Sequence, residues 1–318
     1  MKKIFIVFLV IALAFFGTLY GLKKKYYYNY VKIDENTDLG INREFRDGNV
    51  NINNFLIMGV DSREDKYTST RSDVIQIMSL NQEKETLKMT SVMRDTYLYI
   101  PDKKFYDKIN HGYAYGRDLG LIRALNENLD LNLNEFISVN FGSVVKIVDL
   151  LGGINVKIEA DEVSKIPGIN SQGEHLLNGK QALAYSRLRY TKGGDVRRTS
   201  RQRVVMRAIA DKLKGRSYKE YLRVVQVMLP YINTSLTMKD LTGLVGMYLS
   251  LNNLAMLDNA FPKYQYGRKI KKIWYMVPDD LERNVVGLHN YIYETSKYQV
   301  TDTVRMHSTT IQEKAKRS

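Results

Sequence analysis

The strongest restriction on the fold of this 318-residue chain comes from short apolar segments that lack the polar alternation of a half-exposed sheet. In one of them, Val74–Met78, both faces of the predicted strand are largely apolar. Strands of this kind occur in sheets that helices cover on both faces. Rich in β-branched and aromatic residues, the predicted strands are Phe55–Val60, Asp73–Leu80, Thr86–Val92 and Tyr97–Ile100.

Helical patterns alternate with these strands and predict an α/β fold, a three-layer α/β/α sandwich with a mixed central sheet. The C-terminal third adds two further helical patterns, Tyr218–Tyr231 and Met238–Leu249, and a strand-like segment at Ile273–Val277. From Arg305 onward the chain is polar, and we expect it to be frayed. The earlier predicted helices are Asn110–Asn128, Gly142–Leu151, Gly179–Tyr185 and Val196–Lys214.

An uncharged, mostly apolar stretch occupies Ile4–Leu22. As a helix it would span roughly 28 Å, which is close to the hydrocarbon thickness of a bilayer. No small-x-small cleavage site follows it before Lys23, so we expect one uncleaved transmembrane helix, with a cleaved signal peptide as the alternative. With the short N-terminal tail in the cytoplasm, the rest of the chain lies outside the cell membrane.

These patterns divide the chain into five predicted parts. The anchor is followed by a polar tether, a main α/β domain, a mainly helical part that completes the extracytoplasmic domain, and a disordered tail. In order, the predicted ranges are 1–25, 26–53, 54–214, 215–304 and 305–318.

Composition narrows the classes of function. Lys and Arg number 48 against 34 Asp and Glu, which gives a formal net charge of +14. Such a field attracts an anionic partner, whether phosphate, acidic polymer, membrane surface or nucleic acid. The absence of cysteine excludes thiol catalysis, disulfides and cysteine-ligated metals. The four histidines are scattered and lack the spacing of a zinc site.

A first cluster of charged residues flanks the predicted strands. Asp61 follows one strand and Asp73 opens the next, so an antiparallel pair would set both carboxylates at one sheet edge. A third strand would return Arg94 to that edge, near Arg71. Two carboxylates beside a phosphate suit a hard divalent cation such as magnesium. The alternative is that each Asp caps a turn and each Arg is a solvated charge.

A second cluster lies in the segment from residue 182 to 202. Arg187 and Arg189 are two apart, so they share a side only if the backbone there is extended. Asp195, Arg198 and Gln202 are spaced by three and four and share one stripe of a predicted helix. Asp195 at the start of that helix is either an ordinary N-cap or a neighbour of N–H groups that attract anions. Guanidinium forks match phosphate oxygens well.

Seven motifs in sequence make the chain resemble the LytR-CpsA-Psr family, over roughly residues 54 to 213. A single motif of this kind would be weak, but seven in order are specific. They are Gly59-Val60-Asp61-Ser62-Arg63, Arg71-Ser72-Asp73, Arg94-Asp95-Thr96, Lys108-Ile109-Asn110, Asp149-Leu150-Leu151-Gly152-Gly153, Gly179 through Arg189, and Asp195 through Gln202.

The resemblance implies a membrane-anchored phosphotransferase of Gram-positive walls, with a polyprenyl tail buried in a hydrophobic cleft. By this likeness Asp73 and Asp195 hold magnesium, with manganese as the alternative ion, and Asp61 assists the metal or accepts the acceptor's proton. Arg71 and Arg94 are the catalytic arginines beside Asp61. The pyrophosphate of the substrate is clamped by Arg71, Arg94, Arg187, Arg189 and Arg198, supported by Gln202.

The implied partners are a polyprenyl-pyrophosphate-linked glycopolymer, peptidoglycan and the membrane, without nucleic acid. A peptidoglycan hydroxyl would attack and polyprenyl phosphate would leave, so that no histidine base is needed. The sequence departs from the family at His111 and Gly112, which replace small residues, and at Arg117-Asp118, near a usual Gly pair. These departures concern the acceptor side of the site.

Three other functions are consistent with parts of the sequence. A lipid pyrophosphatase would use the same metal and arginines with water as the nucleophile. A basic nucleic-acid-binding regulator fits the +14 charge, although no helix-turn-helix or aromatic RNA-binding motif is present. A non-catalytic wall-binding module with a bound lipid is the third alternative, and the acidic pairs argue against it.

Overall fold

The fold is taken from a computed structural model, in which the described residues form two compact units. The larger unit takes its residues from 30–139, 233–236 and 251–318, and the smaller from 140–232 and 237–250 together with Asn29. No described helix is long and apolar enough to cross a membrane, and the predicted anchor lies outside the described residues. The described residues are 29–42, 52–60, 71–81, 83–84, 86–140, 143–188, 201, 204–205, 208–209, 211–212, 229–237, 240 and 255–316.

Strands and helices alternate, as predicted. The strands are β1 (Asn29–Tyr30), β2 (Ile52–Val60), β3 (Ser72–Asn81), β4 (Thr86–Val92), β5 (Tyr97–Ile100), β6 (Phe105–Lys108), β7 (Phe136–Asn140), β8 (Ile154–Ile158), β9 (Gly173–Leu177), β10 (Ile232–Thr234), β11 (Ala255–Phe261), β12 (Gln265–Ile270) and β13 (Ile273–Pro278). The helices are α2 (His111–Leu129), α3 (Ser143–Leu150), α4 (Gly179–Arg187), α8 (Leu281–Tyr293) and α9 (Asp302–Lys316), with short 3₁₀ turns at Pro101–Lys103, Val163–Lys165 and Leu229–Tyr231.

A 7-stranded mixed sheet forms the centre of the fold, in the order β1-β10-β7-β2-β3-β4-β11. Strands β2, β3 and β4 are consecutive antiparallel neighbours, whereas β11 pairs with β4 in parallel. The predicted α/β class with a mixed central sheet is therefore confirmed. The C-terminal part was predicted to be mainly helical. Among its described residues it supplies four strands and helix α8, because β10 and β11 join the sheet and β12 pairs with β13. The predicted helix Met238–Leu249 and most of Tyr218–Tyr231 lie outside the described residues.

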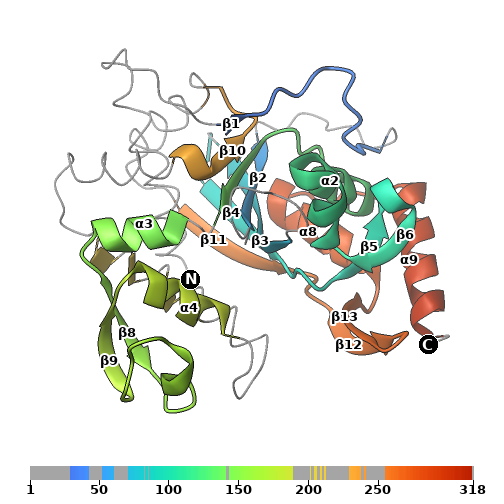
Figure 1. The fold of residues 1–318 in the computed structure, drawn as a ribbon. Helices are drawn as coiled ribbons and strands as arrows, with labels where there is room; N and C mark the ends of the chain where they lie inside the picture. Colours follow the sequence, from blue (N-terminus) through green and yellow to red (C-terminus); the bar gives the residue numbers. More distant parts are fainter. Residues whose placement is uncertain are drawn as a thin grey trace. The chain divides into compact units, whose positions relative to one another are not determined.

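Both faces of the central strands are buried, as the lack of polar alternation predicts. On one face Leu56 pairs with Ile77 and Met58 with Ile75, and these side chains share a core with apolar residues of α2, α8 and α9. Figure 1 shows these three helices on one side of β2, β3 and β4. On the opposite face Met78, which is paired with Met89 and Phe55, is also buried.

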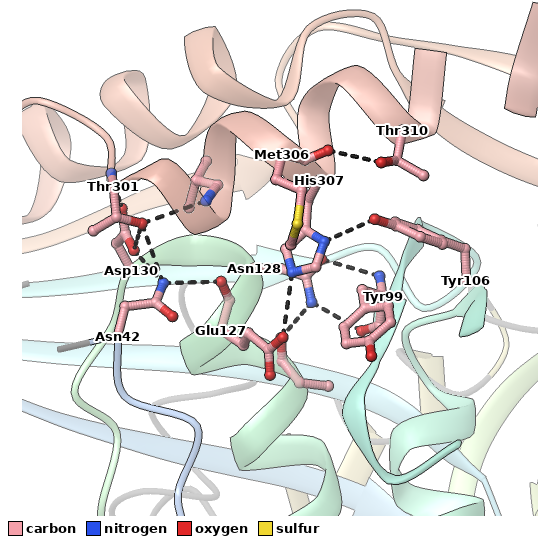
Figure 2. A network of polar contacts seen from close by, with 12 residues as sticks. Asn42, Tyr99, Tyr106, Glu127, Asn128, Asp130, Thr301, Met306, His307 and Thr310 are labelled. Atoms are coloured by element: carbon pink, nitrogen blue, oxygen red, sulfur yellow. Dashed lines mark hydrogen bonds and ion pairs between the residues drawn. The ribbon is translucent and has the colours of Figure 1, made fainter. Parts of the chain in front are cut away.

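The C-terminal helix α9 corrects the prediction of a disordered tail from Arg305. Val304, His307 and Ile311 are spaced by three and four and lie against the core, while Arg305 and Thr309 between them face solvent. Figure 2 shows how His307 is held: its Nδ1 bonds the Tyr106 hydroxyl at 2.8 Å and its ring stacks on Tyr99. The prediction is wrong because the apolar stripe of this mostly polar helix is narrow, so the segment resembles a polar tail in sequence.

Asp130 joins distant parts of the larger unit. This fully buried carboxylate accepts hydrogen bonds from the Thr301 backbone amide at 2.9 Å, the Thr301 hydroxyl at 2.8 Å and the side-chain amide of Asn42 (Figure 2). It also accepts one from the Tyr298 hydroxyl. Thr301 in turn accepts from the Val304 amide at the start of α9. Residues 30–42, which fall in the predicted tether, and residues 255–316 therefore pack with the strands in one unit.

The smaller unit contains the β8–β9 hairpin and helices α3 and α4. A Cβ atom at Gly179 would lie 2.2 Å from the Val145 carbonyl oxygen, so α4 can approach α3 this closely only with glycine there. The Gly179 amide donates to the Asp149 carboxylate at 2.7 Å, and Asn178 forms a reciprocal capping box with Gln181. The Asp149 and Gly179 motifs thus fix the start of α4.

Candidate functional site

The geometry of the antiparallel strands brings Asp73 and Arg94 together. Strands β3 and β4 pair Asn81 with Thr86 and Gln76 with Ser91, and the same register continued past the end of β4 places Arg94 opposite Asp73. The Nη1 atom of Arg94 lies 2.6 Å from Oδ1 of Asp73, and the two side chains are only 10% and 8% exposed. A charge pair this well shielded is coupled far more strongly than one in water.

Asp95 and Lys108 extend this pair. Nζ of Lys108 contacts Oδ1 of Asp95 at 2.7 Å, and Nε of Arg94 lies 3.4 Å from Oδ2 of the same carboxylate. Backbone bonds hold the two segments in place, because the Asn110 amide donates to the Arg94 carbonyl and the Ile109 amide to that of Thr96. The Arg94-Asp95-Thr96 and Lys108-Ile109-Asn110 motifs therefore form one rigid, alternately charged edge.

Arg71 is exposed and lies just before β3, two residues from Asp73. Its charge also acts on Tyr115 of α2: burial and the Asp107 carboxylate raise the pKa of the Tyr115 phenol, while Arg71 opposes that rise. Arg71, Asp73 and Arg94 therefore belong to the same unit, with Arg71 on the side that faces Tyr115.

The second predicted cluster falls in the smaller unit. Arg187 is half-buried and is the last residue of α4, so the prediction of an extended backbone is wrong at this residue. Leu188 follows with φ −58° and ψ 121°, which ends the helix. Five other predicted site residues lie outside the described part of the chain: Asp61, Arg189, Asp195, Arg198 and Gln202.

Arg201, which belongs to the same arginine-rich segment, has a structural role. It is 2% exposed, its Nε contacts the buried Glu162 carboxylate at 2.6 Å, and its Nη1 donates to the Leu188 carbonyl at 3.1 Å. Glu162 also accepts from the Glu159 amide. The ion pair ties the chain that follows α4 to the turn at residues 163–165.

The fit of a metal ion can be judged on the described residues alone. Among them no three His, Asp or Glu side chains are close enough to hold an ion together. Asp73 nevertheless has the chemistry that a hard cation requires, since it is a carboxylate on the partly shielded, alternately charged edge. The other two acidic residues of the predicted set lie outside the described residues.

Sequence reasoning missed several residues of this edge. Lys108 and Asp95 lay inside motifs but received no role, and Asp107 and His111 had a readable spacing of four residues. Tyr275, whose hydroxyl reaches Asp107 at 3.2 Å, is 168 residues away along the chain and left no signal in the sequence.

Fold and site together define a mixed α/β protein in which one edge of the sheet gathers guanidinium, ammonium and carboxylate groups. The chain belongs to the LytR-CpsA-Psr family, because the model of that family (LytR_cpsA_psr) matches residues 20–287.

Known proteins similar to this chain carry names that describe a wall transferase. It is 30% identical over 257 residues to polyisoprenyl-teichoic acid–peptidoglycan teichoic acid transferase TagU of Enterococcus faecalis, covering 78% of this chain and 84% of that protein. It is 34% identical over 244 residues to TagU of Bacillus licheniformis, covering 74% and 77%. A solved structure described as TagT bound to LI-WTA matches with a TM-score of 0.54 at 25% identity, covering 84% and 96%.

Proposed function

We propose that this chain is a phosphotransferase that moves a glycopolymer from a polyprenyl-pyrophosphate carrier to a peptidoglycan hydroxyl, forming a phosphodiester. The observation that carries the proposal is the shielded edge built from Asp73, Arg94, Asp95 and Lys108. The names of its relatives favour teichoic acid as the polymer.

In this proposal the residues of the edge position the donor and neutralise its charge. Arg94 and Lys108 hold pyrophosphate oxygens, while Asp73 and Asp95 keep the two cationic groups apart and oriented. The hydroxyl oxygen attacks phosphorus in line, and polyprenyl phosphate leaves with the electron pair. Catalysis of this type comes mainly from positioning and electrostatic stabilisation. The rest of the clamp would be Arg71, Arg187, Arg189, Arg198 and Gln202.

Magnesium, with manganese as the alternative, belongs to the proposal. Asp73 and Asp195 would hold the ion, and Asp61 would support it or take part in proton transfer. When bound, the ion neutralises charge on the phosphate oxygens. Two carboxylates with substrate oxygens completing the shell is the arrangement that magnesium prefers.

The cellular setting is part of the same proposal. We place the chain in the cell membrane through a single helix at residues 1–25, with the catalytic part outside. A second layer of helices would cover the face of the sheet that carries Phe55 and Met78, completing the three-layer sandwich. That face is apolar and buried, which suits a cleft for the polyprenyl tail.

The proposal is tested by replacing single residues of the edge. Arg94→Ala should lower the release of polyprenyl phosphate from lipid-linked donor by about 100-fold or more, because one preorganised donor to developing charge is lost. Arg305→Ala is the matched control, since that arginine is 49% exposed and pairs only locally with Asp302 in the described contacts. Turnover is followed in detergent with magnesium, and the melting temperature of each variant is compared.

The product separates transfer from hydrolysis. With a glycan acceptor present, the wild-type chain should form a polymer–glycan adduct. A lipid pyrophosphatase would release polyprenyl phosphate without that adduct. Unchanged turnover of a folded Arg94→Ala variant would reject the role given to Arg94.

A further inference from the structure

A histidine–carboxylate pair lies beside the charged edge. Nδ1 of His111, the first residue of α2, is 2.6 Å from Oδ2 of Asp107 on β6. Asp107 also accepts from the Lys108 amide at 2.8 Å and from the Tyr275 hydroxyl at 3.2 Å. Burial alone would raise the pKa of Asp107, but these hydrogen bonds outweigh it and hold that pKa below its ordinary value. Asp107 is therefore ionised at neutral pH.

The pair is continuous with the edge that contains Arg94. Lys108 follows Asp107 directly, bonds Asp95, and lies 5.7 Å from the centre of the Tyr275 ring. The Met276 amide donates to the Asp95 carbonyl at 3.0 Å, which fixes β13 against the same segment. Strands β6 and β13, helix α2 and the segment that follows β4 thus hold the His111 imidazole and the Arg94 and Lys108 side chains in one framework.

His111 carries a buried polar atom without a partner. Among the described residues Nε2 of His111 makes no hydrogen bond, and neither does the buried Oδ1 of its neighbour Asn110. Leaving such an atom unpaired costs roughly 1–3 kcal/mol, so each instance calls for an explanation. Because the Asp107 carboxylate accepts the hydrogen bond from Nδ1–H, Nε2 of the neutral imidazole presents a lone pair. The missing partner of both atoms is a hydrogen-bond donor.

The chemistry of the surroundings selects the donor. A purely structural histidine would account for the bond to Asp107 but not for the orphaned Nε2. A cation is disfavoured, because Lys108 is three residues away and the charge of Arg71 reaches the adjacent Tyr115. A neutral hydroxyl can donate a hydrogen bond to Nε2 and brings no positive charge beside these cations. The ring of Tyr115, which is 42% exposed, lies edge-to-face with the imidazole at 6.0 Å, so the neighbour of His111 on this side reaches solvent.

We propose that Asp107 and His111 form the acceptor-hydroxyl site of this chain, in which Nε2 of His111 binds the attacking hydroxyl and takes its proton. This inference rests on the proposed phosphotransfer. As the new O–P bond forms, the O–H pair stays on oxygen and the proton moves to Nε2. The bond from phosphorus to polyprenyl phosphate breaks, its electron pair leaves with that group, and the imidazolium, stabilised by Asp107, returns the proton to solvent.

The test uses the full chain in detergent with a defined lipid-linked donor and a glycan acceptor. His111→Gln should lower kcat/KM for the acceptor by about 100-fold while the Kd for donor stays within twofold. His175→Gln, in which an imidazole bonded to the Ser171 carbonyl in the smaller unit is removed, should leave both unchanged.

The pH profile gives a readout that a structural role would not move. Transfer by the wild type should fall as pH drops through the range in which imidazole is protonated, and this acid limb should be absent in His111→Gln. The groups facing His111 are Asp107, Tyr115 and, through Asp107, Tyr275. The cations around them are Lys108, next to Asp107 in the chain, Lys103, whose ammonium lies 5.3 Å from the centre of the Tyr115 ring, and Arg71, whose charge acts on Tyr115. The two phenols and the carboxylate stay in one state there, since the pKa of Tyr115 and of Tyr275 is raised and that of Asp107 is lowered.

If the His111→Gln variant is poorly folded, rescue of transfer by added imidazole tests the inference instead. Added imidazole should restore part of the transfer lost in His111→Ala, and should not affect Arg94→Ala. If the wild type forms adduct and His111→Gln matches it in rate and acid limb, or if no rescue occurs in a folded His111→Ala, the inference is wrong. If the wild type forms no adduct at all, it is the proposed function that fails.

Discussion

At the scale of single residues, two lysines pair with the same carboxylate. Their contributions to the free energy of unfolding differ because one is buried and the other is exposed. Lys84 and Lys88 both pair with Glu294 and together hold the pKa of that carboxyl at about 2. Lys84 is 56% exposed, whereas Lys88 is 5% exposed and also donates to the carbonyls of Tyr291 and Ile292 at 2.6 and 3.1 Å. Those carbonyls are among the last four of α8, which have no partner within the helix itself.

Lys88→Met should therefore lower the free energy of unfolding by about 2–3 kcal/mol, because buried carbonyls lose a charged donor. Lys84→Met, the matched control on the same carboxylate, should cost less than about 1 kcal/mol. Urea unfolding at neutral pH measures both. Equal losses in the two variants would show that the helix-end bonds of Lys88 contribute nothing.

The contact between Asp73 and Arg94 could be predicted because both residues flank strands that pair locally. Two turns and an antiparallel register are enough to place them at one edge. The Asp107–His111 pair was missed although its spacing of four is readable, since nothing in one sequence distinguishes a paired histidine from a solvated one. Tyr275 reaches that pair only through the folded sheet.

At the scale of elements, α9 shows how a short apolar stripe can stabilise a polar segment. Ile311 is fully buried on this helix, whereas Met306, five residues earlier, is 55% exposed. Ile311→Ala should destabilise the protein by about 2–5 kcal/mol through lost burial and a residual cavity. Met306→Ala on the same helix should change stability by less than about 0.5 kcal/mol. Thermal or urea unfolding compares them, and a similar small effect of both would mean that α9 is dispensable for folding.

Strand boundaries were predictable to within a few residues, because turn residues interrupt dense apolar runs. The predicted Thr86–Val92 and Tyr97–Ile100 coincide with β4 and β5, and Phe55–Val60 lies inside β2. Helix α9 and strand β11 were not predicted, because their hydrophobic patterns are weaker or their partners are distant in sequence. The buried stripe of α9 is interrupted by polar residues, and β11 pairs with β4 only after most of the chain has intervened.

At the scale of the whole molecule, the order of the strands in the central sheet could not be predicted from the sequence. Strand order β1-β10-β7-β2-β3-β4-β11 draws on segments from both ends of the chain, and which edge a late strand joins depends on the packing of helices already in place. Local hairpins carry their own turn signals, but a parallel partner such as β11 carries none.

Global stability should also show compensation between two buried groups of the larger unit. Burial lowers the pKa of His289 to about 4, so protonation favours the unfolded chain, and stability is lost as pH falls from 6.5 toward 4. Burial raises the pKa of Asp118 to about 6, so the folded chain holds that proton longer, and stability is lost as pH rises from 3.8 toward 6. The two slopes have opposite signs in the same window.

The wild type should therefore vary little in stability between about pH 4 and 6 on account of these groups. Asp118→Asn removes one slope, so its unfolding free energy should exceed that of the wild type by about 3 kcal/mol at pH 7, with the difference vanishing below about pH 4. The remaining dependence, which rises with pH, belongs to His289 near pH 6 and, toward pH 4, also to Glu294 and Asp107, whose pKa values are lowered. Combining Asp118→Asn with His289→Asn should remove only the part that belongs to His289. Urea unfolding at several pH values tests this, and a pH-independent gain in Asp118→Asn would show that relief of local packing, rather than proton linkage, is responsible.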